Sequence, residues 1–184
     1  MGSYFKIVNV TKRQYLDPSD FGEAIKWSSV LHGEHCVEAL KHLLSDSHAM
    51  RKTSRQWDIA GSWAGNSIVL TGDDTSPPDP VGITTSTDDE PRRNLNQLAA
   101  EEFQNISNLA IAMLAECGFE QSILDCAEND NCMFLTIADF ISQTSDSRLK
   151  SAFESRFKTN WRKRYKEVMA DRTWHTPIPL PTEL

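Results

Sequence analysis

Hydrophobic positions follow two patterns along this chain: short β-branched and aromatic runs near the start, and helical spacing over most of the remainder. Residues 4–10 and 13–16 have the strand pattern on either side of a short turn at 11–12. A further run at 67–71 follows a glycine-rich stretch. The sequence therefore predicts an N-terminal hairpin and a strand near 67–71, which together form a small antiparallel sheet.

Apolar residues at helical spacing predict most of the remaining elements. Asp17 has the chemistry of an N-cap and Pro18 suits the first helical position, so a helix is expected from there to Leu31, with Gly33 as its stop. Further helices are expected at 34–45, 94–117, 121–128, 132–143 and 146–172. The prediction is one α+β domain, 1–184, with a small sheet, about six helices and a mostly helical C-terminal half.

Two segments lack any such periodicity. Residues 73–92 are acidic and rich in Pro, Ser and Thr, which is typical of a mobile surface loop. Residues 173–184 hold alternating prolines that prevent helix formation, so an extended tail is expected.

Composition excludes several protein classes. The net charge is −7, hydrophobic residues make up 39% of the chain and charged residues 24%, values of an ordinary globular protein. The four cysteines do not form a disulfide framework, no apolar run is long enough to span a bilayer, and no signal peptide is recognised. A soluble, intracellular and cytoplasmic protein without membrane association is therefore expected, and the acidic balance argues against a general nucleic-acid binder.

The helix predicted at 146–172 has the opposite charge. Nine basic and three acidic residues lie between Arg148 and Arg172, beside a stripe of aromatic residues at steps of three or four. Such a helix suits an acidic protein partner, an anionic membrane or nucleic-acid phosphates. The simpler interpretation is that its aromatic stripe packs on the domain while its bases face the chain's own acidic surface. The candidate partner-binding residues are Trp161, Arg162, Arg164, Tyr165 and Trp174.

A second candidate is a small-molecule pocket beside the strand near 67–71. Its ligand-binding candidates are Trp57, Trp63, Asn66 and Asp74, and its acid–base candidates are Asp17, Asp20 and Asp73. Aromatic walls with carboxylates suit a small cationic or hydroxylated ligand, or general acid–base chemistry. The structural alternative is that Asp17 only caps a helix and that Asp73 only begins the acidic loop.

No metal or cofactor is predicted. His35 and His42 are expected on the solvent face of the helix at 34–45, two turns apart and too distant to chelate one ion. The run Gly61-Ser62-Trp63-Ala64-Gly65 has neither the phosphate-binding, the dinucleotide-binding nor the hydrolase glycine pattern. Cys117, Cys126 and Cys132 also lack the sequence spacing of a zinc site.

Two runs carry a resemblance to a known family. Tyr15-Leu16-Asp17-Pro18 with Phe21-Gly22, followed by Trp63-Ala64-Gly65-Asn66 and Gly72-Asp73, resembles an uncharacterised family of small fungal and bacterial proteins. That family's pattern is Tyr-Leu-(Asp/His)-Pro, Phe-Gly, Trp-Ala-Gly-Asp, a strand and Gly-Asp-Tyr. The resemblance covers roughly the first 75 residues and implies a shared fold but no activity. This chain departs from it with Asn66 in place of Asp and Asp74 in place of Tyr.

Two functions are compatible with the sequence. The favoured one is an intracellular binding protein that contacts a protein partner or small molecule through its C-terminal helix and tail. The alternative is a small enzyme without a redox cofactor, such as a lyase, isomerase, cyclase or hydrolase. The long helices also leave a homodimer open, because periodicity cannot separate a core face from an interface.

Overall fold

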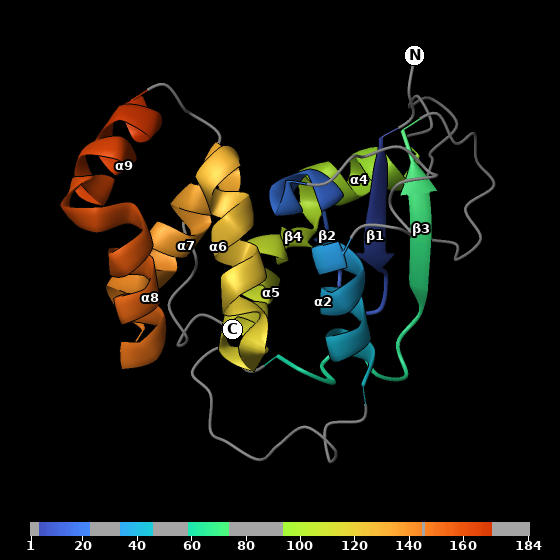
Figure 1. Ribbon diagram of the computed structural model, residues 1–184. Coiled ribbons are helices and arrows are strands. Elements are labelled where there is room, and N and C mark those ends of the chain that lie inside the picture. Colours follow the sequence, from blue (N-terminus) through green and yellow to red (C-terminus); the bar gives the residue numbers. More distant parts are fainter. Residues whose placement is uncertain (1–3, 23–33, 46–58, 74–93, 145, 171–184) are drawn as a thin grey trace.

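A four-stranded mixed sheet forms one side of the molecule (Figure 1). The computed structural model describes residues 4–22, 34–45, 59–73, 94–144 and 146–170. The strand order is β3-β1-β2-β4, with bounds β1 Phe5–Asn9, β2 Gln14–Leu16, β3 Ile68–Gly72 and β4 Gln104–Asn105. The predicted hairpin and third strand are confirmed. Their antiparallel pairing is confirmed as well, and an additional strand that was not predicted, β4, pairs parallel to β2 and makes the sheet mixed.

Strand β4 replaces the middle of a helix that was predicted to be continuous. Asn94 caps α4 (Leu95–Glu102) as expected, but the chain becomes extended at Phe103 and helix returns only at α5 (Ser107–Leu114). The Gln104 backbone amide donates to the carbonyl of Arg13, just before β2, at 2.9 Å. The Ile106 amide donates to the carbonyl of Tyr15 in β2 at 3.0 Å. The unpaired edge of β2 thus competes with the helix for these backbone groups.

A second correction concerns the helix expected from Asp17 to Leu31. Asp17 accepts from the Ser19 amide and is the predicted N-cap, but it begins only η1 (Pro18–Phe21), a 3-10 turn. Gly22 ends this turn with φ of +68°, a left-handed conformation that favours glycine. The remainder of the predicted helix lies outside the described residues, as do 74–92 of the acidic loop and the whole tail.

The basic helix is also divided. Asp146 caps α8 (Ser147–Phe157), and Lys158 then takes a φ of +53° at the start of η3 (Lys158–Asn160). Helix α9 (Trp161–Ala170) follows in a new direction (Figure 1). The predicted stripe of aromatic residues therefore belongs to two helices rather than one.

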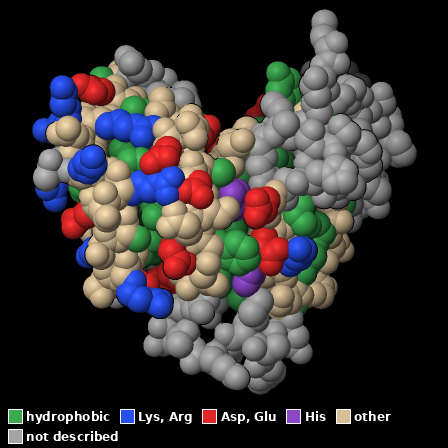
Figure 2. All heavy atoms as spheres, viewed as in Figure 1, with side chains coloured by type: hydrophobic (Ala, Val, Ile, Leu, Met, Phe, Trp, Pro, Cys, Tyr) green, Lys and Arg blue, Asp and Glu red, His purple; other side chains and the backbone are tan. Residues whose placement is uncertain are grey.

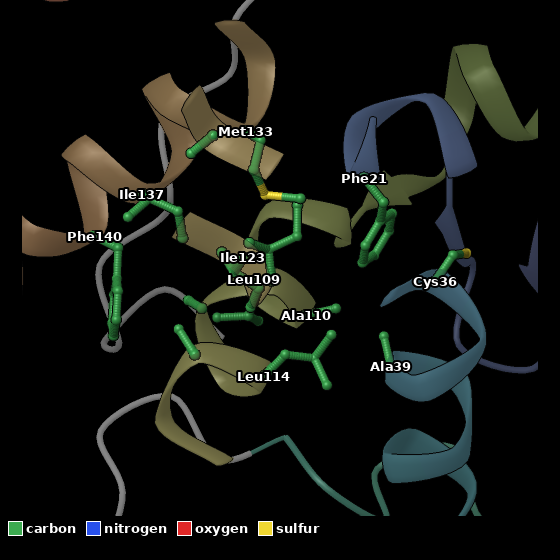
Figure 3. Close-up of a cluster of buried hydrophobic side chains, with 14 of the residues drawn as sticks. Phe21, Cys36, Ala39, Leu109, Ala110, Leu114, Ile123, Met133, Ile137 and Phe140 are labelled. Atoms are coloured by element: carbon green, nitrogen blue, oxygen red, sulfur yellow. The ribbon is translucent and has the colours of Figure 1, made fainter. Parts of the chain in front are cut away.

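The helices build the larger of two hydrophobic cores. The remaining elements are α2 Glu34–Leu44, η2 Ala115–Phe119, α6 Glu120–Asn129 and α7 Asn131–Gln143. Figure 3 shows side chains of η1, α2, α5, α6 and α7 converging on the larger core. A smaller core joins Val8, Val10 and Tyr15 to α4 on the other face of the sheet. Alternate residues of β1 and β2 thus enter different cores, and the α+β prediction with a helical C-terminal half is confirmed.

Helices α8 and α9 lie at the end of the molecule opposite the sheet (Figure 1). Helix α9 packs on α7, and α8 packs on α6 and α7. Among the described helices, none combines the length and apolarity needed to cross a membrane.

Candidate functional site

Trp63, the expected aromatic wall of the pocket beside β3, is a core residue. This side chain is 0% exposed and belongs to the larger core, and its indole N–H donates to Gln14 Oε1 at 2.9 Å. Asn66 Oδ1 accepts from Asn9 Nδ2 at 3.1 Å, which links the loop before β3 to β1. Trp57 and Asp74 lie outside the described residues.

The three candidate aspartates hold the sheet and its first turn together. Asp73 Oδ1 accepts from the Tyr4 amide at 2.9 Å, and Asp17 forms an ion pair with Lys6 at 3.4 Å. Both flank the start of β1, because β2 and β3 each pair antiparallel with it. Asp20 Oδ2 accepts from Asn105 Nδ2 at 2.9 Å. Burial raises the Asp20 pKa, and the charge of Asp17 adds to this shift.

Both described histidines of α2 are buried, which contradicts the predicted solvent face. His35 is 4% exposed and His42 is 7% exposed. The reason is that α2 is covered on two sides: His35 meets Ser122 of α6, and His42 lies edge-on to Phe119 of η2. No group of three potential ligands that could hold a metal ion occurs among the described residues.

A hollow between α7 and α9 gathers most of the described partner-binding candidates. Its volume is about 300 Å³. Its lining residues are Ala138, Asp139 and Ser142 from α7 with Trp161, Arg162, Tyr165 and Lys166 from α9. We call this feature the α7–α9 hollow.

One short hydrogen bond fixes the two walls of the hollow. Tyr165 OH donates to Asp139 Oδ1 at 2.6 Å, and Asp139 is buried on α7. Burial raises the Tyr165 pKa to about 12, with Asp139 contributing through its hydrogen bond and charge. The phenol is therefore protonated at neutral pH and acts as a donor.

Cationic side chains form the rim of the hollow on α9. Arg162 and Lys166 are exposed one helical turn apart, and the Arg162 guanidinium lies 4.9 Å from the centre of the Trp161 ring. Figure 2 shows Lys and Arg side chains gathered over α8 and α9. The hollow thus combines aromatic and aliphatic walls with a positively charged opening.

Arg164, a further partner-binding candidate, points into the protein. Its guanidinium lies 4.1 Å from the centre of the Phe134 ring and donates to the Ala127 carbonyl and to Asn131 Oδ1. Burial lowers its pKa. Arg162 and Arg164 are two positions apart, so a helix places them on different sides. The sequence alone could therefore have predicted that Arg162 and Arg164 do not share one binding surface.

The α7 side of the hollow was missed by sequence reasoning. Asp139 falls within the helix expected at 132–143, and no motif connects it with Tyr165, 26 positions later. The final candidate, Trp174, lies outside the described residues.

Comparisons with protein-family models, curated proteins and solved structures found no match for this chain. The resemblance to the small fungal and bacterial family therefore stays a prediction, and function has to be inferred from the geometry above.

Proposed function

We propose that this protein is a binding protein whose recognition surface is the α7–α9 hollow. Its partner would be an acidic protein segment that inserts one apolar side chain between Trp161 and Tyr165. The observation that supports this most directly is the combination of an aromatic-walled hollow of about 300 Å³ with exposed cations at its rim.

The two parts of the hollow favour different features of the partner. Burial of an apolar side chain against Trp161 and Ala138 provides affinity, at roughly 25 cal/mol per Å² of apolar surface. The rim charges of Arg162 and Lys166 attract carboxylates and increase the association rate. Tyr165 is held by Asp139, so this wall loses little conformational freedom on binding.

An enzyme active site formed by Trp63 and the three candidate aspartates receives less support. Trp63 is fully buried, while Asp17, Asp20 and Asp73 each accept hydrogen bonds that stabilise the fold. We therefore do not assign acid–base chemistry to these aspartates.

The test uses a fluorescein-labelled peptide with one leucine flanked on each side by glutamates, and a matched peptide with glycine in place of leucine. We expect saturable binding of the leucine peptide by fluorescence polarisation and at least about tenfold weaker binding of the glycine peptide. Equal binding of the two peptides would contradict a role for the apolar hollow.

Charge reversal separates the rim from the remaining basic surface. Arg162→Glu should weaken binding of the leucine peptide about tenfold, since it removes a rim cation and adds a repulsive charge. Arg148→Glu is the matched control: it makes the same change in net charge on α8, at a residue that does not line the hollow. Equal losses in the two variants would show general charge attraction instead of a site.

A further inference from the structure

A second hollow lies between η1, α2 and α6, away from the proposed recognition surface. Its volume is about 440 Å³. Its lining residues are Gly22, Glu34, His35, Ser122, Asp125, Cys126, Asn129 and Asp130. Figure 2 shows histidine and acidic side chains together on the face between α6 and α2. None of these residues contributes to the binding function proposed above.

The two nitrogens of His35 face two different groups on α6. Nε2 lies 2.9 Å from Ser122 Oγ, and Nδ1 lies 3.9 Å from Cys126 Sγ. Ser122 and Cys126 are four positions apart, so one face of α6 presents both to the same imidazole. The His35 side chain is buried, whereas Ser122 and Cys126 are half-buried and line the hollow.

This arrangement gives the imidazole a defined function. With the Nε2 proton donated to Ser122 Oγ, the lone pair of Nδ1 faces the thiol of Cys126 and can take its proton. Burial lowers the His35 pKa, against the smaller opposing effect of Glu34, so the ring is neutral near pH 7 and competent as a base. A thiol beside such a base is an activated nucleophile.

We infer that Cys126 is a thiol nucleophile with His35 as its general base and Ser122 as the positioning residue, in a site for a small acyl compound that carries a positive charge. This function is independent of the proposed recognition surface.

The carboxylates of the hollow indicate which substrate charge the site prefers. Asp125 is paired with Arg156 at 2.6 Å, and Asp130 Oδ1 accepts a hydrogen bond from the Met133 backbone amide. Glu34 adds another carboxylate in the first turn of α2. The hollow is therefore negative overall, which favours a cationic group and disfavours an anionic one.

The reaction balances with water as the only co-reactant. Cys126 Sγ bonds to the carbonyl carbon of an ester while the thiol proton moves to His35 Nδ1. The C–O bond to the leaving alcohol breaks, and the alcohol takes the proton from Nδ1. Water then attacks the thioester and passes a proton through the same nitrogen to sulfur, which releases the acid and restores the thiol.

The experiment compares two para-nitrophenyl esters: one of a butanoic acid bearing a trimethylammonium group, and its uncharged tert-butyl isostere. Nitrophenolate release is followed by absorbance, and the acylated cysteine is located by mass spectrometry. Cys117 and Cys132 are also half-exposed in the same chain and serve as internal controls. We expect acylation of Cys126 at least about tenfold faster than of either control, with preference for the cationic ester.

Two variants test the assigned roles, and circular dichroism checks that each is folded. His35→Gln should slow acylation of Cys126 about a hundredfold, and Ser122→Ala should slow it less and change its pH profile. The inference is overturned if Cys126 reacts no faster than Cys117 and Cys132, or if Ser122→Ala leaves both rate and pH profile unchanged. If His35→Gln fails to fold, the rate and pH profile of Cys126 acylation in Ser122→Ala still test the inference. Both variants should bind the acidic peptide normally.

Discussion

Two buried side chains of this protein donate hydrogen bonds to groups that lie far away in the sequence. Asn96 is the clearest example at the scale of single residues: its Nδ2 donates to the Tyr4 carbonyl at 3.0 Å and to the Thr71 carbonyl at 3.1 Å. One amide thus bridges the ends of β1 and β3 and joins both to α4. The indole N–H of Trp63 is satisfied in the same way by Gln14.

Removal of the Asn96 amide should destabilise the fold. Asn96→Ala leaves two carbonyls without this donor, and we expect a loss of about 2 kcal/mol in the free energy of unfolding measured by urea denaturation. Asn160→Ala is the control, because Asn160 is exposed and its replacement should change stability by less than about 0.5 kcal/mol. Equal effects at the two positions would show that the bridge contributes little.

His35 should make stability dependent on pH in mild acid. Its folded-state pKa lies below the ordinary value of 6.5, so the unfolded chain binds more protons in the interval between the two values. The free energy of unfolding should therefore fall as pH decreases through about 6.5 and below. In His35→Gln this decrease should become smaller in urea titrations at a series of pH values; an unchanged slope would contradict the assignment.

At the scale of elements, capping side chains fix where helices of the C-terminal half begin. Asn94, Asp130 and Asp146 each accept a hydrogen bond from an amide in the first turn of the following helix. At Lys158, by contrast, the positive φ costs free energy that a glycine would avoid.

Replacement of Lys158 tests this strain. Lys158→Gly should raise the free energy of unfolding by about 1 kcal/mol, because glycine adopts the observed conformation without a Cβ clash. Lys158→Ala removes the same charge but keeps the Cβ, so it should not be stabilising. If both variants had the same stability in urea denaturation, relief of backbone strain at residue 158 would not explain the change in the free energy of unfolding.

The elements also show which features the sequence could predict. Caps and helical spacing are local signals, so the positions of α2, α6, α7 and the start of α8 were predictable. The interruption at Phe103 was not, because it depends on an edge of β2 that lies about 90 positions earlier. The prediction that His35 and His42 face solvent was wrong for the same reason, because α6 and η2, which lie far away in the sequence, cover them.

At the scale of the whole molecule, four basic residues of the described C-terminal helices occupy two kinds of position. Arg156 pairs with Asp125 and Glu128, and Arg164 donates to groups of α6 and α7, so both hold the C-terminal helices on the domain. Arg162 and Lys166 stay on the surface beside the α7–α9 hollow. The sequence predicted the aromatic and basic residues of α9 as a surface. The hollow could not be predicted, because its second wall belongs to α7 and only the fold brings the two helices together.

The most direct test of the recognition surface is to map where the acidic leucine peptide binds. In a titration followed by ¹H–¹⁵N NMR, we expect the largest shift changes at Ala138, Ser142, the Trp161 indole and Tyr165. The Trp63 indole is the internal control, since it is buried in the larger core, and its signal should stay in place. Shift changes spread evenly over the basic surface, or none within the α7–α9 hollow at saturating peptide, would contradict the proposed function.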